Sequence, residues 1–300
     1  MNQPTLNFVN CPDAKSQHRM AYWQWGEPSA DHVIICAHGL SRQGRDFDVL
    51  AQALCDAAPG KLRVVCPDVV GRGKSDWLQD PMGYQIPQYA ADMIALIALL
   101  QPKTLDWVGT SMGGLIGMVI AGQPNLPLPV PVRKLVLNDV GPALEWSAIQ
   151  RIGLYLGKAG LFDSVQHAAD AMWVISSSFG PHTSEQWLAL TQAMVKPSGA
   201  GGAGFALHYD PAIAIPFASA TEESTKQGEA MLWALYDNIK AQTLLTRGAE
   251  SDLLSVANAH AMTQRGAKAQ LVEFAGVGHA PTFIAADQVK AAVDFLIGEF

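Results

Sequence analysis

The most constraining feature of this sequence is a regular alternation of short apolar runs with amphipathic helical patterns. Six continuous runs occur along the chain, at 33–37, 62–66, 105–108, 134–137, 243–245 and 270–274. A continuous apolar run suits a strand that is buried on both faces, as parallel strands joined by helices are. The alternation therefore predicts an α/β protein whose mostly parallel sheet is covered by helices on both faces.

Two parts of the chain depart from this alternation. Residues 6–10 and 19–25 precede it and are expected to add two antiparallel strands at one edge of the sheet. From 143 to 240, helical patterns rich in Ala, Trp and Met continue without a convincing buried strand. We therefore predict a core formed by 1–142 and 241–300, with 143–240 as an inserted helical cap.

A glycine-rich stretch interrupts the predicted cap. Residues 197–204 read Pro-Ser-Gly-Ala-Gly-Gly-Ala-Gly, which contains too much glycine for a helix or strand. The stretch is expected to be a flexible loop. Two roles are open for it, a solvated connector, which we favour, and the hinge of a mobile lid.

Composition excludes several classes of protein. The apolar fraction of 49% and the charged fraction of 16% fit a well-buried globular protein rather than a disordered chain. A net charge of −7 provides no broad positive field for nucleic acid. The four cysteines form no CxxC pair, so neither a zinc site nor a disulfide framework is expected. There is no run of 18 apolar residues and no secretory signal, which predicts a cytoplasmic protein without a membrane partner.

The segment with the clearest chemistry is Gly-Thr-Ser-Met-Gly at 109–113. It follows the predicted strand 105–108 directly and precedes a helical pattern at 114–121. A serine at such a sharp turn has a strained backbone, and the two glycines let neighbouring elements approach closely. The positive end of the following helix favours negative charge that develops near Ser111. This placement predicts that Ser111 is a nucleophile.

A nucleophilic serine needs a base to take its proton and a carboxylate to orient that base. His279 follows the last predicted strand, in a loop at the carboxyl edge of the sheet. Asp252 follows the preceding strand and is expected at the same edge. We therefore predict a triad of Ser111, Asp252 and His279, in the chain order expected for this kind of enzyme.

With these segments in place, the chain resembles enzymes of the α/β-hydrolase fold family, more specifically serine esterases with a helical cap. The resemblance covers nearly the whole length, through His-Gly-Leu at 38–40, the segment 68–75 and the three predicted catalytic segments. It implies an oxyanion hole made of the backbone N–H groups of Leu40 and Met112.

The resemblance also leaves a choice of acid. Some relatives place the acid after the sixth strand, which makes Asp139 a rival to the favoured Asp252. Glu250 lies two residues from the matching position and receives little weight. On the same grounds, His38 is expected to be structural rather than catalytic.

Two arginines follow the predicted oxyanion segment. Arg42 and Arg45 are expected near the mouth of the pocket, where a guanidinium could bind a substrate carboxylate. The alternative, which we favour, is that both form structural ion pairs.

The sequence thus predicts a serine hydrolase that cleaves small to medium carboxylic esters through an acyl-enzyme, with no cofactor and no metal. One alternative is a hydrolase of carbon–carbon bonds or enol-lactones from aromatic degradation, although Thr110 stands where many such enzymes have asparagine. A ligand-binding protein without activity on the same fold is the alternative from another class. The sequence does not indicate the oligomeric state.

Overall fold

The computed structural model describes residues 3–13, 15, 17–158, 160–198 and 204–298. Its main element is an eight-stranded sheet with the order β1-β2-β4-β3-β5-β6-β10-β11. β1 and β2 are antiparallel to their neighbours, whereas the pairs from β4 to β11 are parallel. The strands are β1 (Thr5–Pro12), β2 (Gln17–Gly26), β3 (His32–Ala37), β4 (Leu62–Pro67), β5 (Thr104–Thr110), β6 (Val132–Asn138), β10 (Gln242–Gly248) and β11 (Gln270–Phe274).

These strands confirm the prediction of a mostly parallel sheet. Each of the six apolar runs lies within a strand, and the two earlier segments form the antiparallel edge. The central strands are fully covered, because the side chains of Val33 to Ala37 in β3 have no exposed surface. Burial on both faces explains why these runs are continuous rather than alternating.

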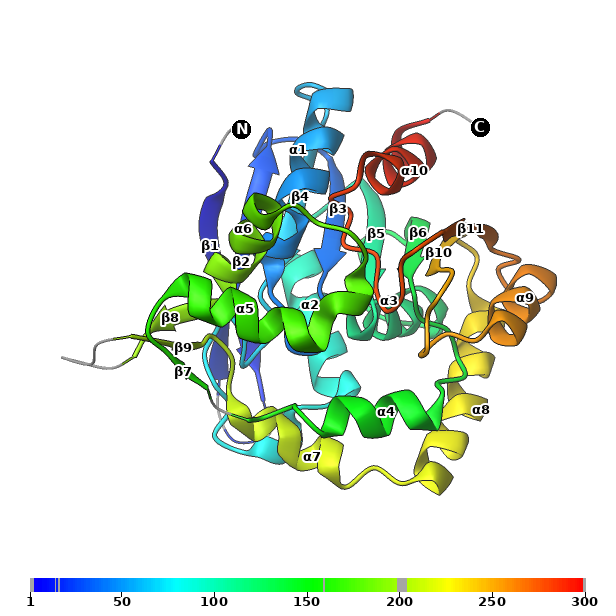
Figure 1. Ribbon diagram of the computed structural model, residues 1–300. Coiled ribbons are helices and arrows are strands. Elements are labelled where there is room, and N and C mark those ends of the chain that lie inside the picture. Colours follow the sequence, from blue (N-terminus) through cyan, green and yellow to red (C-terminus); the bar gives the residue numbers. More distant parts are fainter. Residues whose placement is uncertain (1–2, 14, 16, 159, 199–203, 299–300) are drawn as a thin grey trace.

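Helices cover both faces of the sheet (Figure 1). On one face, α2 (Ile86–Leu100), α3 (Met112–Gly122) and α8 (Glu222–Asn238) contribute to one large hydrophobic cluster, together with α9 (Val256–Gln264). On the other face, α1 (Asp48–Ala57) packs against α10 (Ala286–Ile297) in a second cluster. In the described part of the chain, no helix is long and apolar enough to cross a bilayer.

The segment between β6 and β10 is mainly helical. It contains α4 (Trp146–Gly153), α5 (Val165–Ser176), α6 (Ser184–Met194) and α7 (Ala214–Ala218), followed by α8. α4, α5 and α7 lie in front of and below the sheet in Figure 1. α8 packs closely on α3, because a Cβ on Gly122 would lie 2.2 Å from the Leu235 carbonyl oxygen. The boundaries of a separate cap remain a prediction.

Within this segment the structure contains a small sheet that the sequence analysis did not predict. Its strands are β7 (Leu161–Phe162), β9 (Phe205–Leu207) and β8 (Val195–Pro197), paired antiparallel in that order. They are two or three residues long and only partly buried, so they leave no periodic apolar pattern. The predicted flexible loop joins β8 to β9, and most of it, 199–203, lies outside the described residues.

Candidate active site

Ser111 occupies the sharp turn between β5 and α3. Its φ of 52° lies in the left-handed region, which is strained for a residue with a side chain. The turn requires the flanking glycines, since a Cβ on Gly113 would lie 2.0 Å from the Ala37 carbonyl oxygen. A Cβ on Gly109 would lie 2.3 Å from the Gly113 carbonyl oxygen. The tight packing places Ser111 at the carboxyl edge of the sheet, at the amino end of α3.

The side chains of Ser111, His279 and Asp139 form a continuous hydrogen-bonded chain. His279 Nε2 lies 3.0 Å from Ser111 Oγ, and His279 Nδ1 lies 2.7 Å from Asp139 Oδ2. The carboxylate only accepts, so Nδ1 carries the proton and Nε2 is left to accept from the serine hydroxyl. This arrangement can activate the serine as a nucleophile.

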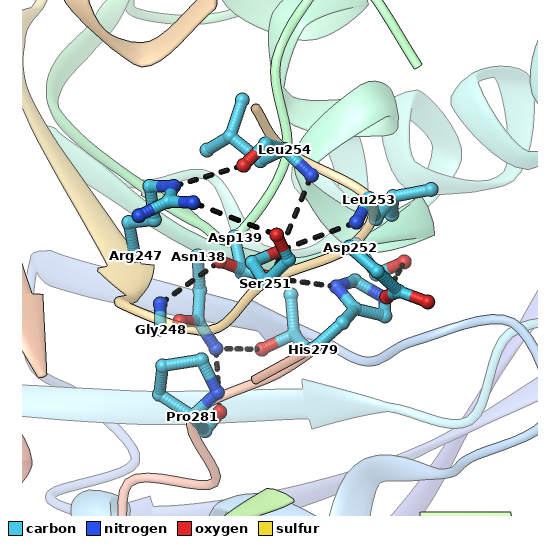
Figure 2. A network of polar contacts seen from close by, with 12 residues as sticks. Asn138, Asp139, Arg247, Gly248, Ser251, Asp252, Leu253, Leu254, His279 and Pro281 are labelled. Carbon is cyan, nitrogen blue, oxygen red and sulfur yellow. Dashed lines mark hydrogen bonds and ion pairs between the residues drawn. The ribbon is translucent and has the colours of Figure 1, made fainter. Parts of the chain in front are cut away.

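Asp139 is buried without exposed side-chain surface and is held by three donors (Figure 2). Besides His279, the Gly248 N–H donates to Oδ1 at 2.9 Å and the Ser251 hydroxyl donates to Oδ2 at 2.6 Å. These hydrogen bonds compensate the cost of removing a carboxylate from water. Asp139 therefore has one fixed orientation, with Oδ2 toward the imidazole.

The predicted pairing of Asp252 with His279 is wrong. The structure pairs Asp252 with Arg151 of α4 instead, through hydrogen bonds of 2.7 Å from Nε and 2.9 Å from Nη2. Asp252 is about half exposed, whereas Asp139 is fully buried beside the imidazole. Glu250, the other rival, is exposed and uses its backbone N–H to bind the Val277 carbonyl oxygen at 2.9 Å.

The predicted oxyanion segment lies beside the serine. A Cβ on Gly39 would lie 3.8 Å from Ser111 Cβ, so the backbone at Leu40 runs past the hydroxyl. Met112 is the first residue of α3, and its N–H has no acceptor within the helix. Both peptide groups are therefore near the place where an oxyanion would form, and their role as its donors remains a proposal.

His38 holds this segment in position. Its Nε2 accepts the Val69 N–H at 2.9 Å, and its Nδ1–H donates to the Gly39 carbonyl oxygen at 2.7 Å. Complete burial lowers the pKa of His38 to about 3, so the ring is neutral. A neutral ring with both nitrogens bonded to the backbone agrees with the structural role expected for it.

Two further positioning side chains escaped the sequence analysis. Arg72 is fully buried and donates from Nε to the Leu40 carbonyl oxygen at 2.9 Å. The Asn138 amide donates to Thr110 Oγ1 at 2.9 Å and to the Pro281 carbonyl oxygen at 2.8 Å, which joins the ends of β5 and β6 to the His279 loop (Figure 2). A polar residue at the end of a predicted buried strand is the signal that could have identified Asn138.

Both predicted arginines form ion pairs. Arg42 lines a cavity next to Ser111, binds Asp46 at 2.6 and 2.8 Å and stacks 5.8 Å from the centre of the Phe179 ring. Arg45 binds Asp48 and stacks 4.8 Å from the centre of the Trp23 ring, in a different hollow from that of Ser111. Their geometry is that of structural ion pairs.

One buried group of potential metal ligands occurs in the described part of the chain, away from the serine. Cys11, His18 and Asp92 place one ligand atom each within 4.8 Å of the others. His18 Nε2 is already hydrogen-bonded to Asp92 Oδ2 at 3.0 Å, and burial raises the pKa of the Cys11 thiol. His18 and Asp92 are thus partners of each other, and the Cys11 thiol lies beside them with the Val9 and Asp92 carbonyl oxygens as its acceptors.

The comparisons with known proteins agree with this fold. The family model described as "Alpha/beta hydrolase family" matches residues 34–292. A 3-hydroxybutyrate-oligomer hydrolase from Cupriavidus necator is 50% identical over 296 residues, covering 98% of each chain. A solved α/β hydrolase from Novosphingobium aromaticivorans has a TM-score of 0.83 and 31% identity over 99% of both chains. A structure from Rickettsia typhi has a TM-score of 0.84 and 28% identity over both full chains.

The chain belongs to the alpha/beta hydrolase family and has its fold. Its relationship to the C. necator hydrolase extends along almost the full length of both proteins, which identifies it as a hydrolase.

Proposed function

We propose that this protein is a serine esterase in which Ser111, His279 and Asp139 form the catalytic triad, with oligomers of 3-hydroxybutyrate as substrates. The observation that carries the proposal is the chain of two hydrogen bonds, 3.0 Å and 2.7 Å long, that joins the three side chains at the edge of the sheet. A serine, a histidine and a carboxylate joined in this way are the complete catalytic triad of a serine hydrolase.

In the first step, Ser111 Oγ attacks the ester carbonyl carbon while His279 Nε2 takes its proton. Asp139 keeps the imidazole in the required tautomer and stabilises the positive charge that forms on it. The carbonyl oxygen becomes an oxyanion, which the Leu40 and Met112 N–H groups would stabilise. His279 then gives its proton to the leaving alcohol oxygen, and an acyl-enzyme remains on Ser111.

The second step repeats this chemistry with water. His279 removes a proton from a water molecule, which attacks the acyl carbon and forms a second oxyanion in the same place. When that intermediate collapses, Ser111 Oγ takes the proton back and the acid leaves. The two steps together consume one water for each ester bond and require no change in the positions of the three side chains.

The substrate class comes from the relative. Identity of 50% over 98% of both chains supports the same kind of substrate as that of the C. necator hydrolase. A short oligomer of 3-hydroxybutyrate is a chain of carboxylic esters, and so it suits a serine esterase. Two cavities of about 310 and 430 Å³ adjoin Ser111 and provide room on either side of a scissile bond.

A fluorophosphonate probe together with a linear trimer tests the proposal. The wild-type protein should become labelled and should release monomer and dimer, which chromatography separates. Ser111→Ala should show neither reaction, whereas Ser29→Ala, an exposed serine in the turn before β3, should behave like wild type. If Ser111→Ala were still labelled and still cleaved the trimer, Ser111 would not be the nucleophile. A wild-type protein that neither reacts nor cleaves esters would instead be a binding protein.

A further inference from the structure

Ser111 lies where two cavities with different linings meet. Both contain Leu40, Ser111 and Ile152 in their walls. We call the cavity of about 310 Å³, which also contains His279, the cationic cavity, and the cavity of about 430 Å³, which also contains Met112, the neutral cavity. An ester bound across Ser111 would extend one of its two parts into each.

The two cavities differ in charge. Three basic side chains line the cationic cavity, Arg42, Arg151 and Lys158, and no carboxylate lines it among the described residues. The described lining of the neutral cavity contains no Asp, Glu, Lys, Arg or His, and is mainly aliphatic and aromatic. The chain as a whole has a net charge of −7, so a cluster of basic side chains on one side of the nucleophile has the opposite sign to the rest of the protein.

Arg151 is fixed so that it faces the cationic cavity. Asp252 binds its Nε and Nη2 groups at 2.7 and 2.9 Å, and the guanidinium also interacts with the side chain of Tyr155, another residue of the cavity wall. A guanidinium has five N–H groups, so these contacts leave donors for a ligand. Asp252 itself does not line the cavity, so the Arg151 guanidinium is the member of the ion pair that faces it. Arg42 is tied down more fully, by Asp46 on one side and the Phe179 ring on the other.

Lys158 adds a charge that is not neutralised locally. It is exposed at the cavity wall and forms no ion pair with any carboxylate in the described part of the chain. Together, Arg151 and Lys158 offer a fixed planar donor and a mobile ammonium to the same space. A guanidinium and an ammonium are the groups that bind a carboxylate most strongly.

We propose that the cationic cavity binds the free carboxylate of the substrate through Arg151 and Lys158, so that the part of the ester carrying that carboxylate is the leaving alcohol. This inference rests on the proposed esterase function and adds the orientation of its substrate. The neutral cavity takes the acyl part, which carries no charge.

The chemistry of a hydroxy-acid oligomer gives this orientation a clear meaning. At every internal ester bond, the alkoxy side leads to the free carboxylate and the acyl side leads to the free hydroxyl. When Ser111 Oγ attacks, the bond to the alkoxy oxygen breaks, and that oxygen leaves with the proton from His279. The released piece therefore ends in the carboxylate that the cationic cavity holds, while the hydroxyl-ended piece stays on Ser111 until water frees it.

Three small esters test whether the enzyme recognises a carboxylate on the alcohol side of the ester, on the acyl side, or on neither. In 3-acetoxybutyrate the carboxylate is on the alcohol side, in mono-sec-butyl succinate it is on the acyl side, and sec-butyl acetate has none. Initial rates of acid release at constant pH give kcat and KM for each. For the wild-type protein we expect kcat/KM for 3-acetoxybutyrate to exceed that for the other two by about tenfold or more, mainly through a lower KM.

Matched substitutions test whether the preference for 3-acetoxybutyrate depends on Arg151 and Lys158. Arg151→Gln and Lys158→Gln should each reduce the preference for 3-acetoxybutyrate by about tenfold, mainly by raising the KM for that ester. Arg45→Gln is the control, since that arginine is also ion-paired but lines another hollow. Lys158 is exposed, so its variant is informative even if Arg151→Gln does not fold.

The outcomes separate the inference from the function on which it rests. Turnover of all three esters with equal efficiency, or a preference for mono-sec-butyl succinate, would overturn the orientation and leave the esterase in place. A preference for 3-acetoxybutyrate that survives both substitutions would overturn the binding of the carboxylate by Arg151 and Lys158. Turnover of none of them would overturn the esterase itself.

Discussion

The Ser251 hydroxyl donates to Asp139 Oδ2, the same carboxylate oxygen that binds His279 Nδ1, at distances of 2.6 and 2.7 Å. Ser251 follows β10, and Asp139 follows β6, its neighbour in the sheet. The hydroxyl also accepts the N–H groups of Leu253 and Leu254 at 3.3 and 3.2 Å. The loop that carries Asp252 thus contributes to the site through Ser251, which holds the Asp139 carboxylate against His279.

We expect Ser111→Ala and His279→Ala each to abolish hydrolysis of p-nitrophenyl acetate, with losses of about 10⁴ to 10⁶ in kcat. The double variant should be scarcely worse than either single variant, because the residues act as a unit. Steady-state rates and a fluorescence check of folding measure this. Retention of more than about a tenth of the activity in either single variant would contradict the relay.

The acid can be tested by a matched pair of substitutions. Asp139→Asn should lower kcat for p-nitrophenyl acetate by about 10³ to 10⁴, because the amide no longer holds the imidazole in the required tautomer. Asp252→Asn should leave this neutral ester almost unaffected, since its partner is Arg151. If the two losses were reversed, Asp252 would be the acid in solution and the geometry described above would not be the active one.

The misassigned acid shows what the sequence can and cannot determine. Buried strands were predictable because continuous apolar runs have few alternatives in a chain of this size. Asp139 and Asp252 both follow strands that pair side by side, so strand order alone placed both near His279. The choice between them depends on the φ of 55° at Asp139 and on the contact of Asp252 with Arg151, 101 residues earlier. Neither is a local property of the sequence.

His38 gives the folding free energy a distinct pH dependence. Burial holds its pKa at about 3 in the folded protein, whereas an unfolded histidine titrates near about 6.5. Between these values only the unfolded chain takes up the proton, so the free energy of unfolding decreases as the pH falls, by up to about 1.4 kcal/mol per pH unit.

A comparison of wild type with His38→Gln isolates this effect. Burial raises the pKa of Asp68 to about 6, which favours the folded state as the pH falls toward 4 and opposes the slope from His38 in the wild type. The variant keeps Asp68, so the stability advantage of wild type over variant should shrink steadily below pH 6.5. Urea unfolding at pH 7, 6, 5 and 4 measures it, and a constant difference would contradict a neutral buried His38.

The turn at Ser111 predicts an asymmetric response to added methyl groups. Gly113→Ala places a Cβ within 2.0 Å of the Ala37 carbonyl oxygen and should destabilise the protein by about 1–3 kcal/mol or more. Gly228→Ala, within α8, meets nothing within 4 Å and should stabilise it by about 0.5–1 kcal/mol. Thermal unfolding compares the two, and equal shifts would argue against the tight turn.

The packing of α8 on α3 has a consequence for how such a protein can change. β6 and β10 are paired neighbours, and α8 leads directly into β10. A chain that ran from the end of β6 straight into α8 would still make a complete strand–helix–strand crossover. Residues 143–220 can therefore diverge while the sheet keeps its geometry, provided that the contacts of Ser178 with the His279 loop are kept: its carbonyl oxygen accepts the Gly278 N–H at 2.6 Å, and its hydroxyl donates to the His279 carbonyl oxygen at 3.1 Å. Natural selection or an engineer can thus alter which ester is accepted without rebuilding the chemistry that cleaves it.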